Sequence, residues 1–172
     1  FNFPAMVPMW MIPIAIGVGN AFVWKPSDKT PLTSALIAAA AEAAGIPAGV
    51  LTLVQGGREA VEALVDHPQI AAVGFVGSTP IARSLYMRAT AHGKRALCLG
   101  GAKNHVLLMP DADPEVAISG ITGSFTGCAG QRCMAASALL AVGQQASSIE
   151  SMIQGVVESA SKLKLGEDMG SV

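Results

Sequence analysis

Short apolar segments that could form buried strands alternate along this chain with helical segments, and the connections between them are short. Such alternation favours parallel strands joined by right-handed crossovers, with helices covering both faces of the sheet. We therefore predict an α/β fold built on a parallel, doubly wound, Rossmann-like sheet. The predicted strands are 21–24, 50–54, 70–76, 95–99, 105–109 and 137–142, and the predicted helices are 5–17, 32–44, 58–66, 80–92, 114–125 and 147–163.

Local signals support several of these boundaries. Thr30 followed by Pro31 predicts a helix start, with a hydroxyl cap and a proline in the first turn. Gly45 is expected to end that helix, since glycine adopts the left-handed backbone of a helix C-terminus. Asp111 and Asp113 are expected to cap the helix that begins near Pro114.

The composition excludes several function classes. The chain is 51% hydrophobic and 13% charged, with a formal charge of −1, so nothing indicates a surface for nucleic acid. Three cysteines without a doubled C-x-x-C spacing predict free thiols in a reducing compartment, and no metal site. No residue from Ala5 to Trp24 is charged, but Pro8, Pro13 and Gly17 interrupt this run. A buried helix and strand is therefore the preferred interpretation over a membrane span.

Parallel sheets bind ligands beyond the carboxyl ends of their strands. Two of the loops expected there have suitable chemistry. In Gly77-Ser78-Thr79-Pro80, small residues before a helix N-terminus could approach a phosphate, although many ordinary turns look the same. Lys25 and Asp28 could hold the two hydroxyls of a ribose, and the alternative is a solvated charged turn.

A third loop, Gly130-Gln131-Arg132-Cys133, carries a thiol beside a guanidinium. Cys133 could act as a nucleophile there, while the alternative is a buried, inert cysteine. Cys98 and Cys128 have apolar neighbours and fit that alternative better. Near the start of the chain, the Asn2 amide could donate to an oxyanion, although this signal is weak by itself.

Taken together, these motifs resemble the aldehyde dehydrogenase superfamily in order and spacing, over essentially the whole chain. Four segments resemble its CoA-acylating methylmalonate-semialdehyde dehydrogenase branch in particular. The motifs shared with the superfamily are Asn2-Phe3-Pro4, Asn20 with Lys25-Pro26-Ser27, Pro31-Leu32, Gly45-x-Pro47-x-Gly49-Val50, Phe75-x-Gly77-Ser78-Thr79 and Gly130-Gln131-x-Cys133. The branch segments are Phe1–Pro8, Gly101-Ala102-Lys103-Asn104-His105, Met109-Pro110-Asp111-Ala112 and Gly130–Ala135.

The resemblance implies roles for these positions. Cys133 would attack the aldehyde, and Asn2 with the backbone N–H of Cys133 would form the oxyanion hole. The resemblance also implies NAD as the hydride acceptor, and the negative charge of Asp28 would disfavour the extra phosphate of NADP. Asp28 is one methylene shorter than the family's usual glutamate. The positions implied to contact the cofactor are Phe1, Lys25, Asp28, Lys29, Ser78 and Gly100.

One departure from the family's motifs distinguishes a hydrolytic from a CoA-acylating reaction. Hydrolytic members have a glutamate 34 positions before the nucleophile, and that position here is Leu99, beside Cys98 and Gly100. A site without this base should release its acyl group to a thiol, so CoA is the expected acceptor. Arg132 would bind the carboxylate of a malonate or methylmalonate semialdehyde, or else activate the thiol or form a structural salt bridge.

The family's members are longer, so we expect this chain to be a fragment of one. Residues 1–98 would be the C-terminal part of an NAD-binding domain, and residues 99–172 the start of a catalytic domain. Gly166–Gly170 resembles the approach to the family's next site loop. The whole protein would be a homo-oligomer without nucleic-acid or membrane partners, in a bacterial cytoplasm or a mitochondrial matrix. The alternatives are a hydrolytic aldehyde dehydrogenase and a catalytically inactive fragment.

Overall fold

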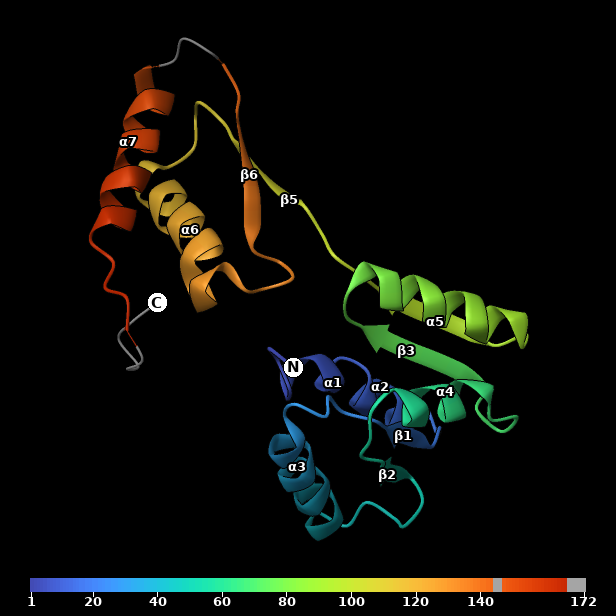
Figure 1. The fold of residues 1–172 in the computed structure, drawn as a ribbon. Coiled ribbons are helices and arrows are strands. Elements are labelled where there is room, and N and C mark those ends of the chain that lie inside the picture. Colours follow the sequence, from blue (N-terminus) through green and yellow to red (C-terminus); the bar gives the residue numbers. More distant parts are fainter. Residues whose placement is uncertain (144–146, 167–172) are drawn as a thin grey trace. The chain divides into compact units, whose positions relative to one another are not determined.

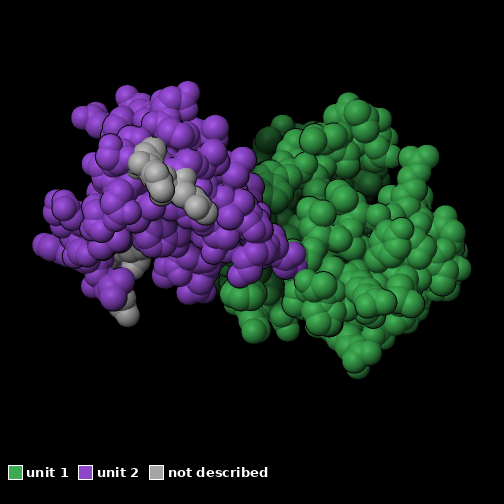
Figure 2. Space-filling view, turned by 90° about the horizontal axis from the view of Figure 1, so that it is seen from above, with its two compact units in different colours: residues 1–100 green, residues 101–172 purple. Residues whose placement is uncertain are grey.

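The computed structural model describes residues 1–143 and 147–166. It consists of two compact units, Phe1–Gly100 and Gly101–Val172, which we describe separately (Figure 2). The division lies two residues beyond the boundary expected at residue 98, and the assignment of the units to a cofactor domain and a catalytic domain stays a prediction. Residues 167–170 of the segment expected to approach a further site loop lie outside the described residues.

The first unit alternates helices and strands, as Figure 1 shows, and its strands form two parallel pairs, β1 with β2 and β3 with β4. In these pairs Trp24 lies opposite Leu53, and Val76 opposite Leu99. The elements in order are α1 (Met6–Met9), α2 (Ile12–Gly17), β1 (Phe22–Trp24), α3 (Pro31–Ala43), β2 (Leu51–Leu53), α4 (Arg58–Asp66), β3 (Ala72–Val76), α5 (Thr79–Ala91) and β4 (Arg95–Leu99).

The second unit contains β5 (Asn104–Leu108), α6 (Pro114–Thr126), the short 3-10 helix η1 (Gly127–Gly130), β6 (Ala136–Ala141) and α7 (Ser147–Ser161). Its strands β5 and β6 are again a parallel pair. The predicted α/β class with parallel strands is therefore confirmed in both units. Among the described residues the strands form three separate pairs rather than one continuous sheet.

Two local expectations are wrong. The predicted helix 5–17 is divided into α1 and α2, because Pro13 lacks an N–H and is tolerated only in the first turn of a new helix, which begins at Ile12. Thr30 does occupy the N-cap of α3, but its side chain forms no cap bond, and its buried hydroxyl has no partner among the described residues. The Ser34 hydroxyl and the Gln55 amide instead donate to the carbonyl of Pro31.

Other boundary signals are confirmed. Asp113 caps α6 by accepting a hydrogen bond from the backbone N–H of Val116 at 3.0 Å. Gly45 has φ +87° directly after the C-cap of α3, as its predicted role requires. In the part of the chain that the structure describes, no helix combines the length and apolar character needed to cross a bilayer.

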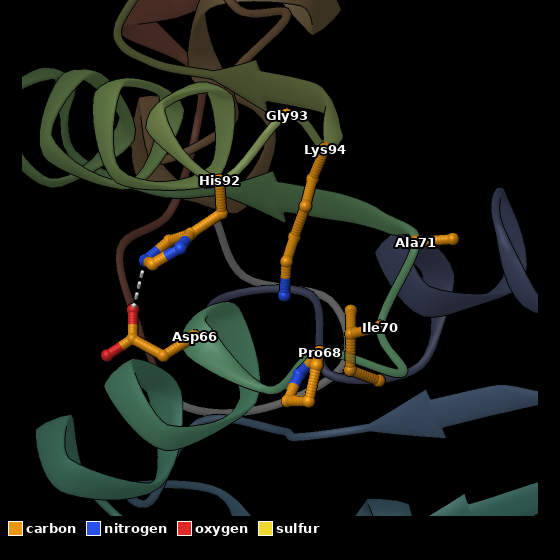
Figure 3. A pocket seen from close by; sticks show the side chains of 7 residues that line it. All are labelled: Asp66, Pro68, Ile70, Ala71, His92, Gly93 and Lys94. Atoms are coloured by element: carbon orange, nitrogen blue, oxygen red, sulfur yellow. Dashed lines mark ion pairs between the residues drawn. The ribbon is translucent and has the colours of Figure 1, made fainter.

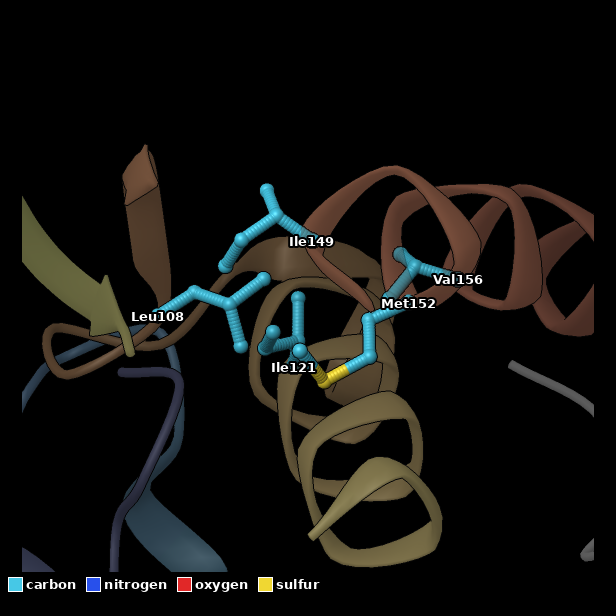
Figure 4. Packing of buried hydrophobic residues seen from close by; sticks show 5 residues of the cluster. All are labelled: Leu108, Ile121, Ile149, Met152 and Val156. Carbon is cyan, nitrogen blue, oxygen red and sulfur yellow. The ribbon is translucent and has the colours of Figure 1, made fainter. Parts of the chain in front are cut away.

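Each unit has its own apolar core. In the first unit, Val65, Leu85 and Ala89 pack between α4, α5 and the strand pair β3–β4. In the second unit, α6 and α7 pack against β5, and Figure 4 shows the side chains that converge there. These are Leu108, Ile121, Ile149, Met152 and Val156. The first core holds β3 and β4, whose carboxyl ends carry the loops of Ser78 and Gly100. The Cys133 loop instead precedes β6 and lies at the amino edge of the parallel β5–β6 pair, so the expectation that it follows the carboxyl end of a strand is wrong.

Candidate active site

The carboxyl edge of the β1–β2 pair brings Lys25 and Asp28 together, as predicted. Lys25 directly follows β1, and its ammonium donates to the carbonyl oxygens of Pro26 and of Gly56, the latter at 2.7 Å. Gly56 follows β2, so this bond fastens the loop after β1 to the loop after β2. Partial burial lowers the pKa of Lys25, and the negative charge of Asp28 acts in the opposite direction.

Gly56 and Gly57 leave room beside these side chains. Gly56 has φ +147°, and a Cβ there would meet the Cβ of Ala60 at 2.7 Å, so both conformation and space require glycine. A Cβ at Gly57 would lie 4.0 Å from Oδ2 of Asp28, which places the carboxylate next to the backbone at the start of α4.

Phe1 and Lys29, both predicted to contact a cofactor, are also neighbours. The Lys29 ammonium lies 5.4 Å from the centre of the Phe1 ring, a cation–π contact. Both residues are exposed, and 69% of Phe1 is open to solvent. An aromatic ring held in this way offers an exposed flat surface on the same unit as Lys25 and Asp28.

The carboxyl edge of the β3–β4 pair brings Ser78 and Gly100 together. Ser78 is the N-cap of α5, and its side chain makes no cap bond. The backbone N–H of Gly77 donates to the carbonyl of Leu99 at 3.1 Å. A Cβ at Gly100 would lie 2.9 Å from Oγ1 of Thr79 and 3.1 Å from its Cα, so only glycine allows this approach to the helix start.

These two edges fit a dinucleotide. Two backbone carbonyls occupy two of the three N–H donors of Lys25, which leaves one for a ribose hydroxyl, and Asp28 can accept from another. The start of α5 presents a helix N-terminus whose cap side chain is uncommitted. The donor set therefore suits a ribose at the first edge and a phosphate at the second.

Cys133 lies in the second unit, on the loop between η1 and β6, and its thiol is exposed. The loop is entered through Cys128, Ala129 and Gly130, with φ of +55°, +52° and +69°. Two consecutive non-glycine residues in this left-handed region are strained, a condition that concentrates at functional sites. The exposed thiol agrees with a nucleophile rather than with a buried, inert cysteine.

The expectation of a buried cysteine is wrong for Cys128, whereas Cys98 is half-buried. Cys128 is exposed, because the left-handed backbone of η1 turns it away from the core despite its apolar sequence neighbours. Cys98 lies on β4 against the apolar core, and burial raises the pKa of its thiol. The loop Gly127–Cys133 thus carries two accessible thiols.

Arg132 contacts the end of α6. Its Nη2 donates to the carbonyl of Gly123 at 2.5 Å and to that of Ser124 at 2.9 Å, where a cation also meets the negative end of the helix dipole. A Cβ at Gly127 would lie 2.7 Å from this guanidinium. Arg132 therefore anchors the loop to α6, a role that none of the sequence-based alternatives described.

Asn104 was missed by sequence reasoning. Its side-chain Nδ2 donates to the carbonyl oxygens of Cys133, at 2.7 Å, and Ala135, at 3.1 Å. No motif indicates this contact, because it joins the start of β5 to a loop about thirty positions later and depends on the strand register.

Two expectations concern more than one unit. Asn2 is exposed in the first unit, and Cys133 belongs to the second, so their pairing in an oxyanion hole stays a prediction. At the position of the hydrolytic base, Leu99 ends β4 with 42% of its surface exposed, and its neighbours are Cys98 and Gly100. None of these three side chains is a carboxylate.

A separate cavity of about 410 Å³ lies at the opposite, amino edge of the β3–β4 pair (Figure 3). His92 there forms an ion pair with Asp66, with 3.2 Å between Nε2 and Oδ1. The buried Lys94 points into the same region and donates to the carbonyl of His67 at 2.6 Å. None of the predicted site residues lines this cavity.

Comparison with known proteins matches residues 1–171 to the model of the aldehyde dehydrogenase family. The chain is 49% identical over 166 residues to malonate-semialdehyde dehydrogenase of Pseudomonas aeruginosa, covering 96% of this chain and 33% of the relative. It is 47% identical to malonate-semialdehyde dehydrogenase 2 of Geobacillus kaustophilus, covering 98% of this chain and 34% of the relative. The chain thus spans about a third of the length of these curated relatives.

Two solved structures are also similar to this chain. The crystal structure of methylmalonate-semialdehyde dehydrogenase from Oceanimonas doudoroffii has a TM-score of 0.89 and 46% identity, over 99% of this chain and 35% of that one. A Sinorhizobium meliloti protein assigned as a methylmalonate-semialdehyde dehydrogenase, complexed with NAD, has a TM-score of 0.87 and 48% identity. That match covers 96% of this chain and 33% of the other.

Proposed function

Because the chain belongs to the aldehyde dehydrogenase family, we propose that it is the part of an NAD-dependent, CoA-acylating dehydrogenase that carries the nucleophile and much of the cofactor site. The substrate would be malonate or methylmalonate semialdehyde, in line with the names of its relatives. The feature that supports this reaction most directly is the exposed Cys133 thiol on a strained, externally braced loop.

In the first step Sγ of Cys133 attacks the aldehyde carbon. Attack by the thiolate forms a C–S bond and moves the carbonyl electron pair onto oxygen. The alkoxide of this thiohemiacetal would accept hydrogen bonds from the backbone N–H of Cys133 and from the Asn2 amide. Among the described residues, the Cys133 N–H donates to no other group. When bound, NAD supplies the hydride acceptor. Transfer of hydride from the former aldehyde carbon to that acceptor would leave a thioester on Cys133.

Lys25, Asp28 and Ser78 would hold the cofactor for that step. The remaining N–H of Lys25 would donate to an adenosine ribose hydroxyl, and the Asp28 carboxylate would accept from one. Ser78, at the N-terminus of α5, would meet the pyrophosphate, with Gly100 allowing close approach and Phe1 and Lys29 adding contact surface. The NAD-bound Sinorhizobium relative supports this choice of cofactor.

The acyl group would leave Cys133 by thiol exchange. The CoA thiolate attacks the thioester carbonyl, the new C–S bond forms, and Cys133 leaves as a thiolate. Leu99 at the position of the hydrolytic base supports this route, because no carboxylate there can activate water. Arg132 has Nη1 left to meet the substrate carboxylate while Nη2 holds the end of α6.

We also propose that the whole protein assembles as a homo-oligomer. Exposed apolar side chains such as Leu97, Leu107 and Leu140 give the strand pairs surfaces that a neighbouring segment or subunit could cover. The bacterial origin of the relatives supports the cytoplasm as its location.

The reaction is tested on this chain by following NADH formation from malonate and methylmalonate semialdehyde, with and without CoA, and by identifying the product. The proposal predicts that CoA accelerates turnover and that the product is a thioester. Equal rates without CoA, with free acid as product, would establish the hydrolytic alternative. No binding of NAD by a folded chain in calorimetry would establish the inactive fragment.

A further inference from the structure

The loop that carries Cys133 has no repetitive structure of its own between η1 and β6. It leaves η1 in a left-handed conformation and passes through Gln131, whose backbone N–H donates to the carbonyl of Cys128 at 2.9 Å. A second internal bond, from the backbone N–H of Ala135 to the carbonyl of Arg132 at 3.1 Å, closes a turn over Cys133 and Met134. The rest of the segment takes its geometry from neighbours, because loops with few internal bonds open at low energetic cost. An exposed nucleophile on it needs external braces to keep a fixed direction.

Arg132 supplies the brace on the N-terminal side of Cys133. Its bonds to the carbonyls of Gly123 and Ser124 tie the preceding residue to α6. On the C-terminal side, the backbone N–H of Ala136 donates to the Ser124 hydroxyl at 3.2 Å. Between these two points lie Cys133, Met134 and Ala135, and a side chain from β5 reaches the carbonyls of the first and the last.

Asn104 holds both of those carbonyls. Because each acceptor is a carbonyl oxygen, only the amide nitrogen can serve them, and it has the two N–H groups that two bonds need. Fixing the carbonyl of Cys133 fixes its ψ angle, and therefore the direction of the Cα–Cβ bond relative to the peptide that follows. The side chain of Asn104 thus acts on the nucleophile through the backbone.

The strand register explains how Asn104 reaches the loop. Asn104 lies opposite Ala136, but the next residue, His105, lies opposite Ala138, so Ser137 is an extra residue on β6. A bulge of this kind bends the strand and re-aims side chains beside it, and bulges are frequent next to active sites. Here the bulge lies directly after the nucleophile loop.

We propose that Asn104 is a positioning residue for Cys133, which holds the thiol in the direction required for attack on a carbonyl carbon. This inference rests on the proposed nucleophilic role of Cys133. It predicts that loss of the two amide bonds slows acylation at saturating substrate, with little effect on how well the substrate binds. Misplacement of a reacting group by about 1 Å costs about a hundredfold in rate.

The test uses p-nitrophenyl acetate on the full chain, because acylation by this ester needs neither NAD nor hydride transfer. The Cys133 thiolate attacks the ester carbonyl, the C–S bond forms, and the C–O bond breaks as p-nitrophenolate leaves. The burst of p-nitrophenolate gives the acylation rate, and peptide mapping identifies the acylated cysteine.

Asn104→Ala removes both donors, and Asn104→Asp keeps the shape but places oxygens against the two carbonyls. Both should lower the saturating burst rate by about ten- to a hundredfold with an unchanged half-saturating ester concentration, and Asn104→Ser should recover part of it. Asn20→Ala is the matched control, since Nδ2 of Asn20 also donates to a backbone carbonyl, that of Ala15, at 3.1 Å. It should leave the burst unchanged.

Thermal unfolding of each variant identifies those that do not fold. Among the Asn104 variants that fold, the most conservative substitution is compared with wild type. A wild-type burst at Cys133 that Asn104→Ala and Asn104→Ser leave unchanged would overturn the positioning role alone. A uniform weakening of substrate binding with an unchanged saturating rate would do the same. Acylation of wild type at Cys128 instead of Cys133 would overturn both this inference and the proposed nucleophile.

Discussion

At the scale of single residues, the three thiols of this chain differ in environment more than in sequence context. Cys98 is half-buried against an apolar core, and burial raises the pKa of its thiol, which reduces its reactivity. Cys128 and Cys133 are both exposed on one loop. The side chain of Asn104 donates a hydrogen bond to the carbonyl of Cys133. Exposure alone therefore does not distinguish the nucleophile, and neither does a bonded carbonyl, because the backbone N–H of Gln131 also donates to the carbonyl of Cys128. The choice of Cys133 rests on the proposed function.

Cys133→Ala should abolish thioester formation, whereas Cys128→Ala should retain it within about twofold, because the proposed mechanism places the thioester on Cys133 alone. Labelled iodoacetamide, followed by peptide mapping, checks the order of thiol reactivity. We expect Cys133 to react first and Cys98 last. Preferential labelling of Cys128 would show that the nucleophile is assigned to the wrong residue.

Asp28→Asn should weaken NAD binding by about tenfold, which corresponds to about 1.4 kcal/mol, and should reduce the preference for NAD over NADP. The reason is the loss of the charged acceptor for the ribose hydroxyls beside Gly57. Isothermal titration calorimetry with both cofactors measures the effect, with Glu158→Gln, an exposed substitution on α7, as the control. Unchanged affinities for both cofactors would remove Asp28 from the site.

At the scale of elements, an ion-pair cluster joins α4 to α5. Arg88 donates to both carboxylate oxygens of Asp66, at 2.7 and 2.6 Å, and lies 3.3 Å from Glu62. The hydrogen bond from Arg88 lowers the pKa of Asp66, and that from Arg58 lowers the pKa of Glu62. The folded state therefore binds these protons less readily than the unfolded chain does.

This cluster should contribute stability above about pH 4, and the contribution should be lost as the pH falls further and the carboxylates take up protons. Asp66→Asn should lower the melting temperature near neutral pH and make it less dependent on pH in the acid range. Circular dichroism melts between pH 3 and 7 measure this, with the exposed Asp111→Asn as the control. A variant whose acid profile equals that of wild type would contradict the contribution.

Helix packing in the second unit offers a matched pair of glycines. A Cβ at Gly155 on α7 would overlap Ile118 of α6, whereas one at Gly120 would meet nothing within 4 Å. Gly120→Ala should therefore stabilise the protein by about 0.5–1 kcal/mol, and Gly155→Ala should destabilise it by about 1–3 kcal/mol. Urea unfolding measures both, and equal effects of the two substitutions would contradict the close α6–α7 contact.

At the scale of the whole molecule, the sequence predicts the order and type of the elements well. The spans 58–66 and 95–99 match α4 and β4, because capping and proline signals mark helix ends and apolar runs mark buried strands. The contacts that the sequence does not predict depend on tertiary structure. The Asn104 brace needs the β5–β6 register, and the bonds of Arg132 need the end of α6 nearby.

The exposed position of Cys128 was missed for a related reason. Apolar neighbours in sequence indicate burial only when the backbone continues regularly, and the left-handed turn at Cys128 and Ala129 breaks that regularity. The proximity of the loops after neighbouring strands was easier to predict, since the carboxyl ends of parallel strands meet along one edge. Lys25 after β1 meets Gly56 after β2, and Gly100 after β4 meets Thr79 after β3, in this way.

The most direct measurement is the mass of the acyl group on this chain after exposure to NAD and malonate semialdehyde, first with CoA withheld and then with CoA added. The account predicts a thioester on the peptide that contains Cys133, stable in buffer and discharged to acyl-CoA when CoA is supplied. An adduct on another residue, or one that water removes as fast as CoA does, would contradict it.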